Sequence, residues 1–157
     1  NEHGKKVFWS RGNGWVIAGL PRILAHLPPD DPLYKKYVTL YGQMAEAIKK
    51  CQQPDGLWRP NLADPEHVPT KETSGSAFFT YAFAWGINNG LLPRDDYLPV
   101  VKRAWRGLVD CVSAEGKLGW VQAVGDRPKA FTPGSTHEYA TGAFLLAGSA
   151  LLALLQN

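Results

Sequence analysis

The segment from Phe8 to Trp15, Phe-Trp-Ser-Arg-Gly-Asn-Gly-Trp, holds the densest group of side chains suited to binding a ligand. It places Arg11 between Trp9 and Trp15 in a glycine-rich turn. An indole presents a flat apolar face on which a sugar ring can stack, and a guanidinium group can pair with both oxygens of a carboxylate. The pattern therefore predicts a site for a negatively charged sugar. The same residues also fit a structural role, with both indoles in the core and Arg11 capping a neighbouring helix.

Two glutamates, Glu72 and Glu138, occupy matching places in the similar segments Glu72–Phe78 and Glu138–Phe144. Each could contact sugar hydroxyls or water near the same opening. An acid in the first turn of a helix also interacts favourably with the helix dipole, and this second interpretation is favoured for both residues. His137 precedes Glu138 and could face a substrate carboxylate, although a solvated histidine is the commoner situation.

The other residues capable of chemistry show no pattern of a metal or redox centre. Cys51 and Cys111 by themselves form neither a disulfide framework nor a zinc site. His67 has no second ligand at a suitable spacing. We therefore expect neither a metal site nor a cofactor.

The composition of the 157 residues is that of a globular protein. Hydrophobic residues make up 45% and charged residues 20% of the chain, which excludes a disordered protein. The net charge of +3 is small and the basic residues are scattered, so we expect no nucleic-acid partner. Ala143–Leu155 is the most apolar stretch, but it is shorter than the roughly 18 residues of a membrane span and predicts a buried helix.

A repeat about two helices long organises the chain. Gln53–Trp58 has a counterpart in Ala114–Trp120, and Glu72–Phe78 recurs 66 residues later as Glu138–Phe144. In each unit an amphipathic outer helix precedes a glycine–tryptophan turn, a polar loop and an inner helix that is apolar nearly all round. The predicted helices are, in order, about Gly14–His26 (inner), Leu33–Gln52 (outer), Ser74–Ile87 (inner), Asp95–Val112 (outer) and Thr141–Leu155 (inner).

Alternating outer and inner helices predict an all-α fold of the α/α-toroid type. Strand patterns are scarce, apart from a short hairpin expected near Leu118–Val124. Five helices are too few to close a ring, so we expect residues 1–157 to form one partial domain, an incomplete barrel. Its uncovered inner faces predict self-association or completion by an N-terminal half, because large exposed apolar patches promote association.

Three motifs, in order along the chain, resemble those of the unsaturated uronyl hydrolases, glycoside hydrolase families 105 and 88. Phe8–Trp15 resembles their W-[AS]-R-G-N-G-W signature. Glu72–Phe78 and Gly86–Gly90 resemble the E-T-S-G-[ST]-A and G-I-N-x-G patterns of family 105, and His137–Phe144 resembles its last inner helix. The resemblance implies the C-terminal half of an (α/α)6 barrel. It also implies release of unsaturated galacturonyl residues from rhamnogalacturonan fragments of pectin.

The chemistry that this resemblance implies is hydration of a C4=C5 double bond. An acid protonates C4, water adds at C5, and the resulting hemiketal opens and releases the neighbouring sugar. The family's proton donor is an aspartate that precedes the Phe8–Trp15 segment, and nothing in Asn1–Val7 matches it. The resemblance therefore implies no catalytic residue in this chain and an isolated chain without activity. The residues expected to bind substrate are Trp9, Arg11 and Trp15, with Glu72, His137 and Glu138 as further contacts.

Three alternatives fit the same sequence. An unsaturated glucuronyl hydrolase acting on glycosaminoglycan fragments has the same general motifs. A non-catalytic half-barrel that binds an acidic sugar would need only Trp9, Arg11 and Trp15. Gln52–Trp58 resembles the Q-x-x-D-G-x-W repeat of triterpene cyclases, but the chain lacks their D-x-D-D acid motif. The sequence does not distinguish a cytoplasmic from a periplasmic bacterial protein.

Overall fold

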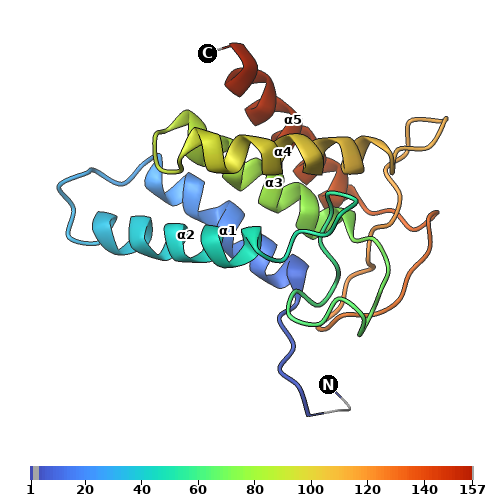
Figure 1. Cartoon of the computed structure of the whole chain (residues 1–157). Coiled ribbons are helices and arrows are strands. Elements are labelled where there is room, and N and C mark those ends of the chain that lie inside the picture. Colours follow the sequence, from blue (N-terminus) through green and yellow to red (C-terminus); the bar gives the residue numbers. More distant parts are fainter. Residues whose placement is uncertain (2–3, 157) are drawn as a thin grey trace.

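The described residues form an inner row of three helices and an outer pair (Figure 1). The computed structural model describes Asn1 and residues 4–156. In the inner row, α3 packs against both α1 and α5, while α2 packs mainly against α1, and α4 against α3. The all-α class predicted from the sequence is confirmed. The helices are α1 (Ser10–Leu24), α2 (Tyr34–Lys49), α3 (Thr73–Asn88), α4 (Arg94–Val109) and α5 (Glu138–Gln156).

The central helix, α3, is buried along almost its whole length. Its side chains are small or apolar, and Phe79 and Phe83 are fully buried. Small residues let α1 approach α3 closely, since a Cβ on Gly14 would lie 3.1 Å from Phe78 and 3.4 Å from the Cα of Gly75. The glycine and alanine content that predicted an inner helix therefore has a direct packing reason.

The outer helices α2 and α4 each turn one apolar face toward the inner row. The buried hydroxyl of Tyr41 in α2 donates a hydrogen bond to the Ala82 carbonyl over 2.6 Å. The ring of Tyr97 in α4 lies 5.3 Å from the ring of Phe83 in an edge-on arrangement. Charged side chains occupy the opposite faces, as the amphipathic pattern predicted.

The last helix, α5, is buried on one side only, which differs from the predicted burial all round. Ala140, Ala143 and Ala147 are buried, whereas Leu145 and Leu152 are 62% and 58% exposed. The difference arises because α3 and α4 cover a single side of α5. By length and composition alone α5 could cross a membrane, with a mean hydropathy of 1.5, but core helices of soluble proteins meet the same criterion.

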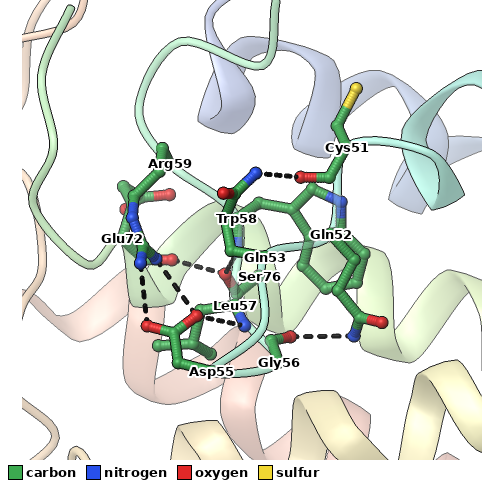
Figure 2. A network of polar contacts seen from close by, with 10 residues as sticks. All are labelled: Cys51, Gln52, Gln53, Asp55, Gly56, Leu57, Trp58, Arg59, Glu72 and Ser76. Carbon is green, nitrogen blue, oxygen red and sulfur yellow. Dashed lines mark hydrogen bonds and ion pairs between the residues drawn. The ribbon is translucent and has the colours of Figure 1, made fainter. Parts of the chain in front are cut away.

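The turn that follows α2 joins three helices (Figure 2). The buried Trp58 indole donates to the Ile48 carbonyl of α2 over 2.7 Å, and the Trp58 backbone N–H donates to the Ser76 hydroxyl of α3 over 3.0 Å. Gly56 has a φ of +85°, and a Cβ at this position would collide with the Arg103 carbonyl of α4. Only glycine fits this close approach. The glycine–tryptophan turn is therefore a packing device between helices.

The two long connections, residues 50–72 and 110–137, gather at the end of the bundle where α1, α3 and α5 begin (Figure 1). We call this the loop end. The connections at the opposite end, residues 25–33 and 89–93, are shorter. The loop end therefore brings side chains from distant parts of the sequence together.

The hairpin predicted near Leu118–Val124 is wrong. Within this part of the described chain, Leu118 forms only an isolated bridge with Val112. Trp120 has a φ of 57°, a left-handed conformation that interrupts an extended strand. Val121 then donates its backbone hydrogen bond to Ser135, over 3.0 Å, rather than to a neighbouring hairpin strand.

Candidate functional site

The guanidinium group of Arg11 lies among the segments of the loop end and is nearly buried, at 3% exposure. It donates hydrogen bonds to the Gln122 carbonyl, to the Ala123 carbonyl over 2.9 Å and to the Tyr139 hydroxyl over 2.6 Å. These bonds join α1 to the connection 110–137 and to α5. All three acceptors are neutral oxygens. The positive charge of Arg11 is therefore buried without a hydrogen-bonded carboxylate among the described residues.

Trp9 packs against this guanidinium group, with Arg11 Cζ 4.6 Å from the ring centroid. Its indole N–H donates to the side-chain oxygen of Gln122 over 3.0 Å. We call Trp9, Arg11, Gln122 and Tyr139 the Arg11 cluster. Trp9 also borders a cavity of about 570 Å³, whose other lining residues are Asn1, Val7, His67, Asp126, Arg127 and Pro128.

Trp15 lies one helical turn after Arg11 and is 52% exposed. Its ring centroid is 4.4 Å from that of Phe78 and 6.2 Å from that of Tyr139. Arg11 Cζ is 5.0 Å from the same Tyr139 ring, so Arg11 and Trp15 share the side of α1 that lies next to Tyr139. The sequence spacing predicted this shared face. The exposed part of the Trp15 indole offers a surface on which a sugar ring could stack.

Glu72 does not reach any opening, because its side chain is fully buried at the N-cap of α3. One carboxylate oxygen accepts hydrogen bonds from the backbone N–H and the hydroxyl of Ser74. The other accepts from the Gly75 N–H over 2.6 Å and from the Ser10 hydroxyl over 3.2 Å. Glu72 therefore satisfies helix-end donors and ties α3 to the first residue of α1.

Burial raises the pKa of the Glu72 carboxyl above its usual value. The hydrogen bonds from Ser74 and Gly75, and the nearby charge of Arg11, oppose this shift because each favours the ionised form. A raised pKa is a property of many acid catalysts. A group with no exposed surface cannot touch a sugar in this structure, so its pKa here reflects its position in the core.

Glu138 and His137 lie at the surface, where α5 begins. The Glu138 side chain is 90% exposed, and its carboxylate is 4.0 Å from Nδ1 of His137. The His137 ring stacks on Tyr139, with centroids 5.4 Å apart and an angle of 10° between the planes. His137 therefore lies beside the Arg11 cluster, while Glu138 extends into solvent.

The sequence matches the family Glycosyl Hydrolase Family 88 over residues 1–155. The chain belongs to glycosyl hydrolase family 88. Two curated relatives are each named "Unsaturated 3S-rhamnoglycuronyl hydrolase", one from Formosa agariphila at 49% identity and one from Alteromonas sp. (strain LOR) at 41% identity. An "Unsaturated rhamnogalacturonyl hydrolase" from Bacillus subtilis (strain 168) is 25% identical over 77% of this chain and 33% of its own length. These findings confirm the resemblance to unsaturated uronyl hydrolases.

The family 88 chain spans well under half the length of these curated relatives. The matches cover 96% and 97% of this chain, but 40% of the Formosa agariphila protein and 37% of the Alteromonas protein. A solved structure described as "Glycosyl hydrolase family 88 from Bacteroides vulgatus" is 44% identical and superimposes with a TM-score of 0.91. That superposition covers 97% of this chain and 45% of the other. The five helices therefore match part of a larger family 88 fold.

The described residues of this family 88 chain contain no group of three or more His, Cys, Asp or Glu side chains that could hold a metal ion. Asp126, at the cavity beside Trp9, pairs with Arg127 over 2.9 Å. This pairing holds the pKa of the Asp126 carboxyl below its usual value. Asp126 and Arg127 thus place a carboxylate and a guanidinium group in contact with one another at this cavity.

The sequence analysis missed two members of the Arg11 cluster. Tyr139 lies inside the His137–Phe144 motif, so its aromatic side chain next to a predicted contact was an available signal. Gln122 lies in a connection without a recognised pattern, and only the tertiary structure brings it to Trp9 and Arg11. The structure thus adds an amide and a phenol to the predicted aromatic and guanidinium groups.

Proposed function

We propose that this chain supplies the sugar-binding part of an unsaturated uronyl hydrolase. The observation that carries the proposal is the buried charge of Arg11, which is bonded to neutral oxygens and surrounded by aromatic rings. The hydrogen-bond partners of this charge are neutral, and the nearby Glu72 carboxylate is engaged by Ser10, Ser74 and Gly75, so Arg11 would attract an anionic ligand close to it. A uronic acid combines a carboxylate with a ring face that Trp15 or Trp9 could contact. This chemistry supports an acidic sugar as the ligand.

The substrate that fits the relatives best is an unsaturated uronic acid linked to rhamnose. The two relatives with 49% and 41% identity carry the name rhamnoglycuronyl hydrolase. The relative named for a rhamnogalacturonyl substrate, which the sequence motifs favoured, is 25% identical. We therefore place an unsaturated rhamnoglycuronyl oligosaccharide first and the rhamnogalacturonan fragment second.

The proposed reaction is hydration of the C4=C5 bond, with a proton donor outside this chain. Protonation of C4 and addition of water oxygen to C5 would yield a hemiketal, whose opening releases the neighbouring sugar. Glu72 is sealed in the core, and Asp126 is held ionised by Arg127, so neither suits the task of donating a proton to C4. The described residues therefore support binding and orientation of the substrate.

A chimera tests this proposal directly. In it, this chain replaces the matching segment of the Formosa agariphila hydrolase, and turnover is followed by loss of the ultraviolet absorbance of the double bond. We expect activity on an unsaturated rhamnoglycuronyl disaccharide. We also expect Arg11→Met and Trp15→Ala to lower kcat/KM by about 10- to 100-fold, because the first removes the buried positive charge and the second removes the exposed stacking surface.

Arg103→Met is the matched control, because Arg103 bonds to Gln52 on another part of the surface. It should leave kcat/KM within about twofold of the parent chimera. A folded chimera that neither binds nor turns over the disaccharide would contradict the proposal. Full activity in folded Arg11→Met and Trp15→Ala variants would do the same.

The second candidate is a non-catalytic module that binds an acidic sugar. The exposed Trp15 indole and the buried Arg11 charge also support this function. Calorimetry of the 157-residue chain with the same disaccharide separates the two: binding by the chain, combined with an inactive chimera, favours the module. Turnover by the chimera favours the hydrolase.

The exposed leucines of α5 support the expectation of self-association when the chain is alone. Leu145 and Leu152 give α5 an uncovered apolar side. Light scattering should detect dimers or larger species of the chain. Leu145→Lys combined with Leu152→Lys should shift it toward monomer. A monomer at high concentration before the substitutions would contradict this expectation.

A further inference from the structure

Gln122 is a polar side chain in an almost fully buried position, with 1% exposure. Burying an amide costs free energy unless its donors and acceptors are hydrogen-bonded. The bonds made by this amide therefore indicate its role.

The Gln122 side chain connects Trp9 to the loop that carries Arg127. Its oxygen accepts the indole N–H of Trp9 over 3.0 Å, and its nitrogen donates to the Arg127 carbonyl over 2.6 Å. Its backbone carbonyl accepts from both Arg11 and the Tyr139 hydroxyl. One residue thus connects α1, α5 and the loop around residue 127.

These bonds hold the Trp9 ring in one orientation. The indole edge is tethered by the amide oxygen, and the Arg11 guanidinium packs over the ring at 4.6 Å. Trp9 and Arg127 both line the cavity of about 570 Å³. The amide therefore determines where two parts of this cavity lie relative to one another. Side chains that are already held in place before binding lose less conformational entropy when a ligand binds.

We propose that Gln122 is a positioning residue that holds Trp9 and the residue-127 loop as a binding surface for a sugar ring of the substrate. This inference rests on the proposed function. Because Gln122 is almost fully buried, it acts through Trp9 and the residue-127 loop. Its loss should therefore weaken substrate binding and leave the chemical step intact.

The test uses the same chimera and measures KM and kcat separately. Gln122→Met has a similar length but neither the acceptor for Trp9 nor the donor for Arg127. We expect KM to rise about 3- to 10-fold, as the loss of one or two net hydrogen bonds predicts, and kcat to stay within about twofold. Gln122→Asn, whose shorter side chain cannot span both partners, should act in the same direction and replaces Gln122→Met if that variant does not fold.

A double-mutant cycle separates positioning from a general loss of stability. Trp9→Phe keeps a ring but has no N–H for Gln122 to hold, so in that background Gln122→Met should raise KM by a smaller factor than in the parent chimera, because only the bond to the Arg127 carbonyl is then lost. Gln52→Met is the matched control: the Gln52 amide bonds to the Gly56 and Val100 carbonyls and to Arg103, in the turn after α2. Its KM should stay within about twofold of the parent value.

The outcomes distinguish this inference from the proposed function. An inactive, non-binding parent chimera overturns the proposed function and this inference with it. An active parent chimera overturns the positioning role alone in two cases. In the first, Gln122→Met lowers kcat at constant KM; in the second, it changes KM equally in the parent and in the Trp9→Phe background. An equal rise in KM for Gln52→Met also overturns it.

Discussion

The first turns of α3 and α5 begin with similar sequences but are held in place in different ways. Glu72 is buried and caps α3 with its own carboxylate, whereas Glu138 is exposed and makes no such cap. The start of α5 is instead connected to α1 through Tyr139, whose hydroxyl bonds to Arg11 and to the Gln122 carbonyl. A sequence repeat therefore preserved the helix but not the means of stabilising its first turn.

The difference follows from what covers each helix start. Ser10 and Gly75 lie against Glu72, so water is excluded from the α3 cap. No described helix lies over the Glu138 side of α5 in the same way, and the carboxylate there stays hydrated. The carboxylates at equivalent positions thus contribute differently to the stability of their helices, because their neighbours differ.

The largest effect expected from this comparison concerns the two glutamates. Glu72→Ala removes four hydrogen bonds from buried or helix-end groups and should lower the free energy of unfolding by about 3 to 5 kcal/mol. Glu138→Ala should change it by less than about 0.5 kcal/mol, as for other exposed positions. Denaturant unfolding of both variants measures the contrast. Similar losses for the two would remove the distinction drawn between the helix starts.

The second effect concerns one glycine near the start of each of these helices, Gly75 in α3 and Gly142 in α5. A Cβ on Gly75 would lie 2.7 Å from the Glu72 carboxylate and 3.0 Å from the Ser10 hydroxyl, whereas a Cβ on Gly142 meets nothing within 4 Å. Gly75→Ala should therefore destabilise the chain by about 1 to 3 kcal/mol. Gly142→Ala should stabilise it by up to about 1 kcal/mol, because alanine favours a helix. Thermal unfolding reports both, and a stabilised Gly75→Ala variant would be the contrary result.

The third effect concerns the link between α1 and α5. Tyr139→Phe removes the hydroxyl that accepts from Arg11 and donates to Gln122, and it should cost about 1 kcal/mol. Amide hydrogen exchange should accelerate in the first turn of α5 and stay unchanged in the first turn of α3. Equal acceleration in both turns would mean that the two helix starts are not held independently.

The smallest effect concerns pH. Because burial raises the pKa of Glu72 above its usual value of 4.5, folding favours the protonated carboxyl. The stability that this group contributes is fully present below about pH 4.5 and is lost as the pH rises through the folded-state pKa. The difference in unfolding free energy between the natural chain and Glu72→Gln should therefore decrease as the pH rises from about 4 to about 8. A difference that grows over this range would show that the cap favours the ionised form.

Much of the fold could be predicted because it depends on local patterns. The apolar spacing in Leu33–Gln52 and Asp95–Val112 predicted α2 and α4 to within a few residues of their observed ends. The small residues of Ser74–Ile87 predicted that α3 is an inner helix. The hairpin near Leu118–Val124 was wrong, because the left-handed conformation of Trp120 is set by contacts that its neighbours in sequence do not reveal.

The candidate site was predicted only in part. The types and spacing of Arg11 and Trp15 predicted a shared face, and the structure brings both to Tyr139. The sequence could not distinguish a carboxylate contact from a structural role for Arg11. Its described hydrogen bonds go to neutral oxygens more than 100 residues away, and these partners depend on how the connection 110–137 folds back.

The amino-acid sequence by itself determined the helical class, the order of the layers and the presence of a cationic and aromatic segment, because each depends on the periodicity or chemistry of nearby residues. Only the tertiary structure decided that the Glu72 side chain is fully buried and that the Glu138 side chain is exposed to solvent. It also decided that Gln122 accepts a hydrogen bond from the Trp9 indole. Burial and hydrogen bonding between distant segments depend on which surfaces meet, and equivalent positions in a repeat meet different surfaces.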